Sequence, residues 1–413
     1  MVPLITRLGS GLALTGVEAG VWRLLLARSL RGFCDGFVAV LLPAYLLALG
    51  MSTLSVGLIS TSTLLGSAIA TMLVGMLGNR FARRSLLLVA AGVMVATGIG
   101  FSSFSTLWPL LIVAFLGTMN PSAGDVSLFL PIEHACLAEA SEARVRTALF
   151  ARYSLVGALS GALGALLAGA PDWMAAHLGV AALPAMRGMF VLYALAGLAI
   201  LALYRHMPTH PSTSTGAHTP LGPSRWIVVR LALLFSVDAF AGGLVVNALL
   251  TLWLMARFDL SIGAAGQFFF CTGLLSAGSQ LAAAPLARRI GLLNTMVFTH
   301  IPPSLCLIAA AFMPSLPLAL LMLLLRSALS QLDVPTRSAY VMAVVTPAER
   351  AAAASLTAVP RSLAAAIAPT IASGLIGLGW LTAPLLACGV LKILYDLALL
   401  MACRHVRLEG EHS

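Results

Sequence analysis

The chain has 413 residues, of which 60% are hydrophobic and only 9% are charged, and its mean hydropathy is +1.00. A soluble globular protein carries roughly 25% charged residues, so the composition excludes a water-soluble fold and indicates that lipid surrounds most of the surface. The net charge of +10 would by itself suit a nucleic-acid-binding protein, but the basic residues follow a membrane pattern instead, as shown below.

Apolar blocks of membrane-spanning length recur along the whole chain. A helix needs about 20 apolar residues to cross the hydrocarbon core of a bilayer. Hydropathy and turn residues predict twelve such helices, over residues 24–49, 53–78, 85–105, 107–130, 147–170, 187–204, 226–255, 261–286, 292–312, 316–335, 353–377 and 382–403. The predicted fold class is therefore an all-α membrane protein with twelve transmembrane helices.

A segment rich in Pro, Ser, Thr and His separates the sixth and seventh predicted helices. It has no apolar periodicity, which is typical of an exposed linker. Its histidines are irregularly spaced and the six cysteines of the chain are scattered singly, so we predict no metal site and no cofactor. The predicted organisation is a tail over 1–23, a six-helix half over 24–204, a linker over 205–225, a second six-helix half over 226–403 and a tail over 404–413.

The two halves repeat each other in sequence at a nearly constant offset. The matching residues are Pro109 with Pro317, Asp125 with Asp333 and Ser154 with Ser362 at 208 positions, Gly57 with Gly266 and Arg80 with Arg289 at 209, and Asp35 with Asp238 at 203. A parallel six-plus-six repeat is typical of secondary transporters whose binding site lies between the halves. The repeat therefore predicts a carrier.

Basic residues are distributed unevenly between the two sides of the predicted membrane. Fifteen arginines fall in the tails and in one alternate set of connections, whereas the other set holds only Arg187 and Arg257. The positive-inside rule places the arginine-rich side in the cytoplasm. We therefore expect a multi-pass protein of the cell inner (plasma) membrane with both termini cytoplasmic.

The connection after the second predicted helix carries the stretch GMLGNRFARR, from Gly75 to Arg84. It resembles the G-x-x-x-D-R-x-G-R-R signature of the major facilitator superfamily, except that Asn79 replaces the acid and Ala82 replaces a glycine. The resemblance implies two pseudo-symmetric six-helix halves, and it extends loosely to the bacterial drug/proton antiporter branch.

The same resemblance implies a gating motif at the cytoplasmic ends of the helices. A small residue at Gly75 would let the second and eleventh helices approach, and the nearby arginines would pair with a carboxylate of the fourth helix, for which Asp125 is the candidate. The predicted gating residues are Gly75, Asn79, Arg80, Arg83, Arg84, Asp125, Asp333, Arg288 and Arg289.

Charged residues within the predicted spans are candidates for function, because each costs at least about 2.5 to 3.5 kcal/mol to insert. Asp35 and Asp238 lie near the middle of the first and seventh helices. A buried carboxylate near a basic group can titrate as a cavity opens, so we predict that these two couple transport to protons, with Arg31 as a local counter-ion of Asp35. Purely structural ion pairing of both aspartates remains the alternative. The predicted substrate-cavity residues are Arg31, Arg326, Arg152 and Arg361.

Other polar and small residues within the spans are expected to have structural roles. Lys392 and Asp396 are four residues apart in the twelfth helix and are predicted to neutralise one another. His300 precedes two prolines and is expected to mark a kink. A small-residue face suited to close helix packing is formed on the fifth helix by Gly157, Gly161 and Gly164.

These features favour a secondary active transporter that exports small lipophilic or amphipathic compounds in exchange for protons. Two alternatives stay open: proton-coupled uptake of a small organic anion, and a non-transporting membrane sensor of the same fold, which would be expected to carry a signalling domain. An enzyme is not expected, because the sequence shows no nucleophile–base pair, metal-ligand set or phosphate-binding loop. The expected partners are a small-molecule substrate, protons and the lipid bilayer, without nucleic acid, and the protein is expected to be monomeric.

Overall fold

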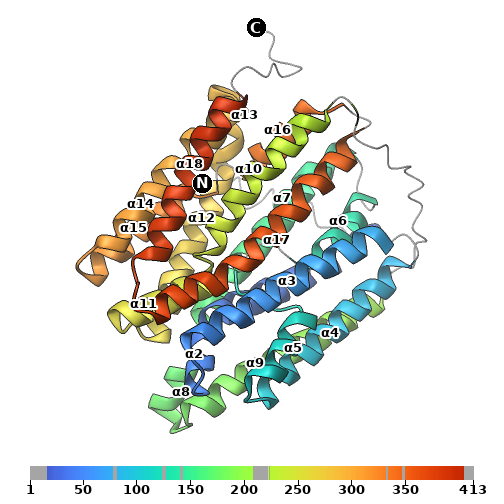
Figure 1. Ribbon diagram of the computed structural model, residues 1–413. Coiled ribbons are helices and arrows are strands. Elements are labelled where there is room, and N and C mark those ends of the chain that lie inside the picture. The colour runs from blue at the N-terminus through green and yellow to red at the C-terminus, as the bar shows by residue number, and fades with distance from the viewer. Residues whose placement is uncertain are drawn as a thin grey trace, which may run out of the picture.

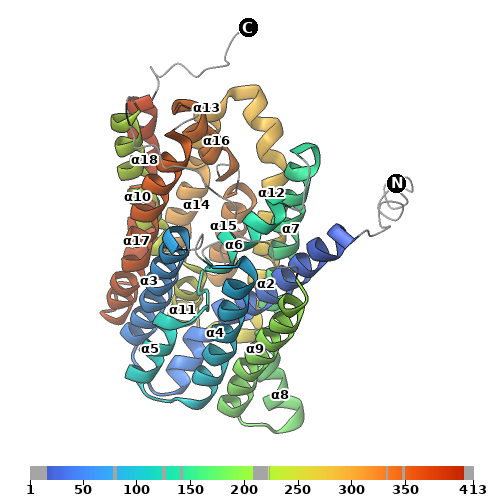
Figure 2. The same ribbon diagram turned by 90° about the vertical axis from the view of Figure 1, so that its right-hand side faces the viewer.

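Every regular element in the computed structural model is a helix over the residues that it describes, which are 16–77, 81–122, 127–139, 143–207, 222, 224–331, 334–346 and 349–403 (Figures 1 and 2). The first half contains α2 (Gly16–Ala48), α3 (Thr53–Leu77), α4 (Arg83–Ser103), α5 (Leu107–Leu116), α6 (Phe129–Glu139), α7 (Ala143–Leu167), α8 (Ala170–Leu178) and α9 (Ala182–Arg205). The second half contains α10 (Arg225–Gly243), α11 (Asn247–Phe258), α12 (Ile262–Ile290), α13 (Leu292–Phe298), α14 (Ile301–Phe312), α15 (Leu316–Leu329), α16 (Val334–Val344), α17 (Arg350–Gly377) and α18 (Ala383–Cys403).

All twelve predicted spans are helical, but four of them are broken into two helices. The fourth consists of α5 and α6, the seventh of α10 and α11, the ninth of α13 and α14, and the tenth of α15 and α16. Nine stretches of the described residues are long and apolar enough to cross a bilayer, and α5 and α15 are shorter apolar helices at matching places in the two halves. The architecture agrees with a fold of two six-helix halves.

The fourth predicted span is wrong at its end. Helix α5 stops at the extended backbone of Gly117, and Asn120 then accepts hydrogen bonds from the backbone nitrogen and hydroxyl of Ser122. This local turn competes with helix formation, and the next helix among the described residues begins at Phe129. Because the helix then continues to Glu139, nine residues beyond the predicted end at 130 join the fourth span.

Within the first half, α2 and α7 pack closely, and glycines face each other at their contact. A Cβ atom on Gly36 would overlap the backbone of Gly161, and a Cβ on Gly164 would overlap the carbonyl of Phe33. The small-residue face predicted on the fifth helix is thus a packing surface against α2. Close backbone approach of this kind is how helices associate strongly without a hydrophobic driving force.

The two halves touch each other mainly at one end of the molecule. We call this end the far side, and we call the end where α9 stops and α10 starts the linker side. On the far side, a Cβ on Gly57 of α3 would overlap Ser373 of α17, and the hydroxyls of Thr61 and Thr370 are 2.8 Å apart. The second contact between the halves is similar, since a Cβ on Gly266 of α12 would lie 2.5 Å from the carbonyl oxygen of Ala165 on α7.

The same helix pairs separate toward the linker side. A Cβ on Gly75 of α3 or on Gly278 of α12 would meet nothing within 4 Å. Arg23 at the start of α2 donates to the carbonyl oxygen of His206 at the end of α9, which shows that α2 begins on the linker side. Among the described residues, the halves are therefore in contact at the far side and separated at the linker side.

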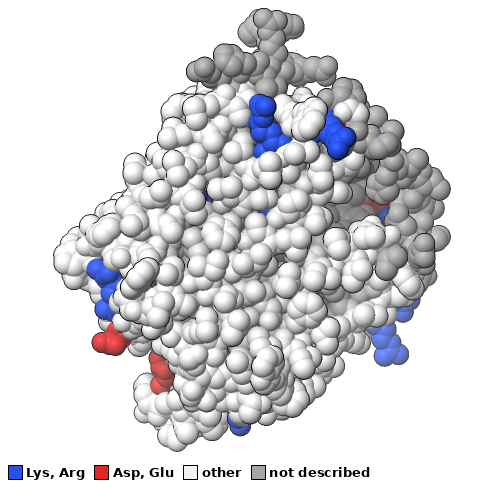
Figure 3. Space-filling view, in the orientation of Figure 1, with Lys and Arg blue, Asp and Glu red and all other residues white. Residues whose placement is uncertain are grey.

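The surface carries its charge at the margins (Figure 3). On the face shown, acidic and basic atoms lie near the edges of the molecule, and a broad, almost uncharged band separates them. Such a band is what a lipid-facing surface requires.

Candidate functional site

A buried polar network lies inside the first half, centred on Glu133 of α6. One carboxylate oxygen of Glu133 accepts hydrogen bonds from Arg31 of α2 and Tyr153 of α7, and the other accepts from Tyr204 of α9. Arg31 also donates to the hydroxyl of Tyr153 over 3.1 Å. We call these four residues the Glu133 network, and it joins four helices of the half.

Aromatic rings complete the surroundings of this network. The guanidinium carbon of Arg31 lies 4.2 Å from the ring centre of Phe129, and that of Arg28 lies 5.2 Å from the ring of Tyr153. Glu133 is 0% exposed and Arg31 is 4% exposed. A fully buried ion pair costs free energy unless hydrogen bonds satisfy it, and here two tyrosine hydroxyls supply those bonds.

A second network lies inside the second half, centred on His300 between α13 and α14. The Nδ1 atom of His300 is 3.0 Å from both carboxylate oxygens of Asp396, and its Nε2 atom is 3.2 Å from the Nζ atom of Lys392. Lys392 in turn is 2.7 Å from one oxygen of Asp238, and Arg337 of α16 is 3.0 Å from the other. We call these five residues the His300 network.

One contact between an arginine and a phenylalanine occurs in both networks at positions related by the repeat, but the two residues have exchanged helices. In the first half, an arginine of α2, Arg31, stacks on a phenylalanine of α6, Phe129. In the second half, an arginine of α16, Arg337, lies 5.4 Å from the ring centre of a phenylalanine of α10, Phe235. Phe129 and Arg337 are 208 positions apart, the offset of the repeat, and Arg31 and Phe235 are 204 apart. The same contact is thus made with the arginine on the opposite helix.

The predicted coupling residues have different surroundings. Asp238 is buried and ion-paired with Lys392 and Arg337. Asp35 is only partly buried in α2, and Arg31, expected to be its counter-ion, forms its ion pair with Glu133 instead. The reason is the extra length of the fourth span, which brings a carboxylate beside Arg31 that the predicted helix did not contain.

The remaining candidate cavity arginines lie on three different helices, α7, α15 and α17. Arg326 is partly buried in α15 and makes no ion pair with any residue that the structure describes. Arg152 of α7 and Arg361 of α17 are both exposed. Of the predicted cavity residues, Arg31 alone belongs to a described buried network.

The gating residues are described only in part, because Asn79, Arg80, Asp125 and Asp333 lie outside the described residues. Arg83 at the start of α4 forms an ion pair with Glu139, the last residue of α6. Among the described residues, an arginine of the motif thus pairs with a carboxylate at the end of α6, and this carboxylate is Glu139 and not the predicted Asp125. Two further motif arginines, Arg288 and Arg289, are exposed at the end of α12.

A carboxylate that the sequence did not suggest holds the linker side of the second half together. Glu349 precedes α17 and accepts hydrogen bonds from the backbone nitrogen of Gly222 and from the hydroxyl of Thr346 over 2.8 Å. The hydroxyl of Ser224 and the nitrogen of Gly222 stabilise the charged form, which lowers the pKa of Glu349 below its usual value. Glu349 thereby ties the end of the linker to the start of α17.

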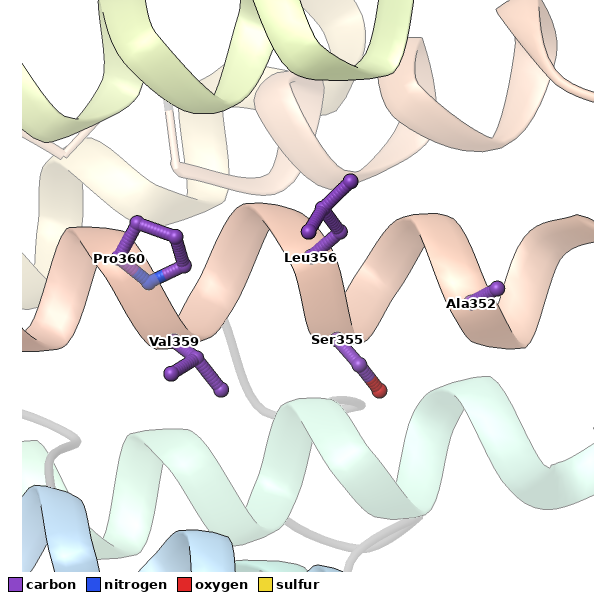
Figure 4. Close-up of a pocket in the computed structure, with 5 residues that line it drawn as sticks. All are labelled: Ala352, Ser355, Leu356, Val359 and Pro360. Atoms are coloured by element: carbon purple, nitrogen blue, oxygen red, sulfur yellow. The ribbon is translucent and has the colours of Figure 1, made fainter. Parts of the chain in front are cut away.

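An apolar hollow of about 410 Å³ opens along the linker-side part of α17 (Figure 4). Leu356 and Pro360 lie on the side of the helix that faces α10, and Ser355 and Val359 lie on the opposite side. Ala352 completes the lining. Among the described residues, no group of three or more His, Cys, Asp or Glu side chains could hold a metal ion.

Sequence reasoning missed most of both networks. Lys392 forms an ion pair with Asp238, and Asp396 pairs with His300, two partners that the i,i+4 spacing of Lys392 and Asp396 did not suggest. Arg337 was not among the predicted site residues, and it is buried in α16 at 8% exposure. Glu133 carried a usable signal, because it is an acid within the apolar run FLPIEHACLA.

Two six-helix halves that meet at one end, with charged networks buried inside each, define a membrane transporter rather than an enzyme. The sequence model of the Major Facilitator Superfamily matches residues 24–332, which is most of the chain, and the protein belongs to this family.

Comparison with individual proteins supports the same fold. The chain is 24% identical over 378 residues to the uncharacterized membrane protein YJR124C of Saccharomyces cerevisiae, covering 82% of this chain and 84% of that protein. Among solved structures it is similar to a D-xylose-proton symporter, with a TM-score of 0.72, 17% identity and coverage of 97% and 100% of the two chains. It is also similar to the nucleoside transporter NupG, with a TM-score of 0.70, 14% identity and coverage of 95% and 100%. At these identities the two structures share the fold.

Proposed function

We propose that the protein is a secondary active transporter that exports small lipophilic or amphipathic compounds in exchange for protons, as members of the drug/proton antiporter branch do. The observation that carries the proposal is the one-sided contact between the halves. Gly57 and Gly266 pack tightly against the other half on the far side, whereas Gly75 and Gly278 face open space on the linker side. A carrier that alternates between two openings needs to close one side while the other is open.

The arginine distribution supports a cytoplasmic linker side, with both termini in the cytoplasm of a cell inner membrane. In that orientation the described conformation is open to the cytoplasm, and the apolar hollow on α17 is on the accessible side. Its lining of Ala352, Leu356, Val359 and Pro360 suits an apolar solute. Reporter fusions near Ser214 and at the C-terminus are both expected to report cytoplasm, and a periplasmic signal from either would contradict this orientation.

Protons are the proposed driving ion because carboxylates lie at membrane depth in both halves. Asp35 is partly accessible and Asp238 is held by two basic groups. A carboxylate between burial and a basic partner changes its proton affinity when either changes. Both aspartates therefore remain the proposed coupling residues.

The test is transport by purified protein in proteoliposomes with an imposed pH gradient. The probes are ethidium and rhodamine 6G as lipophilic cations and fluorescein as an organic anion. We expect a dye to accumulate in vesicles with an acidic interior, because protons leave as the dye enters. Asp35→Asn is expected to lose this gradient-driven accumulation while counterflow at equal pH survives. The proposal fails if no probe moves in response to the gradient.

Uptake of an organic anion is the second candidate, and Arg326 favours it. This arginine lies at membrane depth, is partly accessible and has no described ionic partner, so an anionic group of a substrate could neutralise it. In the same vesicles, this function predicts that fluorescein accumulates when the exterior is acidic. Arg326→Ala would then weaken fluorescein transport and leave the cationic dyes unaffected.

A further inference from the structure

The His300 network contains a buried side chain that can gain a positive charge. His300 is 7% exposed, and it is the one histidine among the buried residues that the structure describes. An imidazole can hold a proton on one or on both of its nitrogens. Each ring nitrogen of His300 lies within hydrogen-bonding distance of a charged side chain, so adding a proton would change a contact that the structure describes.

The hydrogen bonds of His300 fix which proton it carries. A carboxylate only accepts and an ammonium group only donates. The Nδ1 atom, 3.0 Å from Asp396, is therefore the donor, and the Nε2 atom, 3.2 Å from Lys392, is the acceptor. An imidazole that donates from Nδ1 and accepts at Nε2 is neutral.

Adding a proton to Nε2 of His300 would reverse the direction of that contact. Two donors, the imidazolium N–H and the Lys392 ammonium, would then face each other over 3.2 Å. An acceptor for the new N–H is the oxygen of Asp238 that Lys392 now contacts, 3.7 Å away. Arg337 holds the other oxygen of Asp238 at 3.0 Å, so Asp238 stays in place while His300 and Lys392 compete for it.

We propose that His300 is a further proton-binding residue of transport, in addition to the two aspartates, and that its protonation displaces Lys392 from Asp238. This inference rests on the proposed proton coupling. The bond between α10 and α18, made by Lys392 and Asp238, is replaced by a bond from the α13–α14 connection to α10, made by His300. The proton therefore changes which helices are tied to α10, a helix that packs on α17 at the contact between the halves.

Charged and titratable side chains from several helices surround His300 and influence whether it binds a proton. Asp238 faces it from α10, and Lys392, Tyr395 and Asp396 face it from α18. Arg337 of α16 reaches it through Asp238, and α15, which packs on α14, carries Arg326. With two aspartates and the two basic residues Lys392 and Arg337, the network is neutral before protonation. It gains one positive charge afterwards, which favours a second conformation.

The experiment measures the opening of the linker side as a function of pH and needs no substrate. Spin labels are placed at Met76 of α3 and Ser355 of α17, both exposed, in a background without the native cysteines, and their distance is measured in proteoliposomes. Between about pH 8 and about pH 5.5, which brackets the histidine titration, the open population is expected to fall about threefold in the wild type. In His300→Gln the distance distribution is expected not to change with pH.

Two further variants decide between a proton carrier and a structural histidine. His177→Gln changes an exposed histidine of α8 and is expected to respond to pH like the wild type. Lys392→Met removes the competing donor, so the pH midpoint of the transition is expected to rise by about one unit. The inference is overturned if His300→Gln keeps the wild-type response or, should that variant not fold, if Lys392→Met leaves the midpoint unchanged. A wild type that neither responds to pH nor moves any probe would instead overturn the proposed function itself.

Discussion

The two halves bury their charges in different ways. In the first half, Glu133 is surrounded by Arg31 and two tyrosines, and each of these donates to it. In the second half, Asp238 is contacted by Lys392 and Arg337, and Lys392 is shared with His300. In the first network three donors converge on one carboxylate, whereas the second contains one donor that two acceptors share.

This difference assigns different tasks to the halves. A carboxylate held by three donors has no alternative partner, so the Glu133 network stabilises one arrangement of α2, α6, α7 and α9. A lysine shared between an aspartate and a histidine can be released by one proton. The repeat thus provides the first half with a fixed anchor and the second half with a switchable contact.

The largest effect on stability is expected from removing Glu133, the anchor of the first half. Glu133→Ala would leave the buried guanidinium of Arg31 without its counter-charge, which costs about 3 to 5 kcal/mol. We expect the midpoint of thermal unfolding in detergent micelles to drop steeply. Glu139→Ala is the matched control, because Glu139 is 41% exposed and should cost at most about 1 kcal/mol. Equal losses in the two variants would show that Glu133 is not an anchor.

A smaller change sharpens the contrast in pH response. Tyr204→Phe removes one hydrogen bond to the Glu133 carboxylate and should lower the free energy of unfolding by about 1.5 to 3 kcal/mol. The pH dependence of linker-side opening should stay unchanged, because Tyr204 carries no proton that leaves near neutral pH. A shifted pH midpoint in this variant would mean that both halves respond to protons.

The linker-side ends of the halves allow a finer comparison between two carboxylates. Glu139 pairs with Arg83 at the surface, whereas Glu349 is buried and accepts bonds from the linker. The double variant with Arg83→Glu and Glu139→Arg exchanges the two charges. It should restore the free energy of unfolding that either single substitution lowers. We expect a coupling of about 0.2 to 1 kcal/mol in a double-mutant cycle of unfolding, smaller at high salt. A coupling of several kcal/mol would mean that the pair is buried in the conformation that unfolds.

The smallest expected effect is the pH dependence of the Glu349 contact. Its folded pKa lies below the usual value, so its stabilising effect is present above the unfolded pKa of about 4.3. The effect is lost as pH falls through the folded pKa. Glu349→Gln should therefore unfold more easily than the wild type at neutral pH, and the difference should disappear in acid below about pH 4. A difference that persists in acid would assign the loss to packing instead of charge.

The sequence predicted the fold better than the site, for a physical reason. Hydropathy and the 208-residue repeat depend on local composition and on register, and both are visible along the chain. The pairing of Lys392 with Asp238 joins helices 154 residues apart, and i,i+4 spacing alone suggested Asp396 instead. The family membership was predicted from the motif after the second helix, while the proton and substrate assignments stay predictions.

The fourth helix shows where a better prediction was possible. A turn around Asn120 divides it, and an apolar run interrupted by Glu133 follows. Had that run been included, an acid at membrane depth opposite Arg31 could have been proposed from the sequence. No comparable signal pointed to Glu349, because its contacts depend on where the linker ends in space.

The anchor of the first half also has a consequence for biosynthesis. Arg31 enters the membrane with the first helix, but Glu133 is synthesised 102 residues later. At about 5 to 20 residues per second, the arginine waits roughly 5 to 20 s for its partner, and an unpaired arginine costs about 2.5 to 3.5 kcal/mol at the centre of a membrane helix. The glycine face of α2 waits longer still, because Gly161 and Gly164 come after Glu133. Until α7 is inserted, the glycine face of α2 has no helix to pack against. The first half can therefore assemble around α2 only after its fifth span has been synthesised.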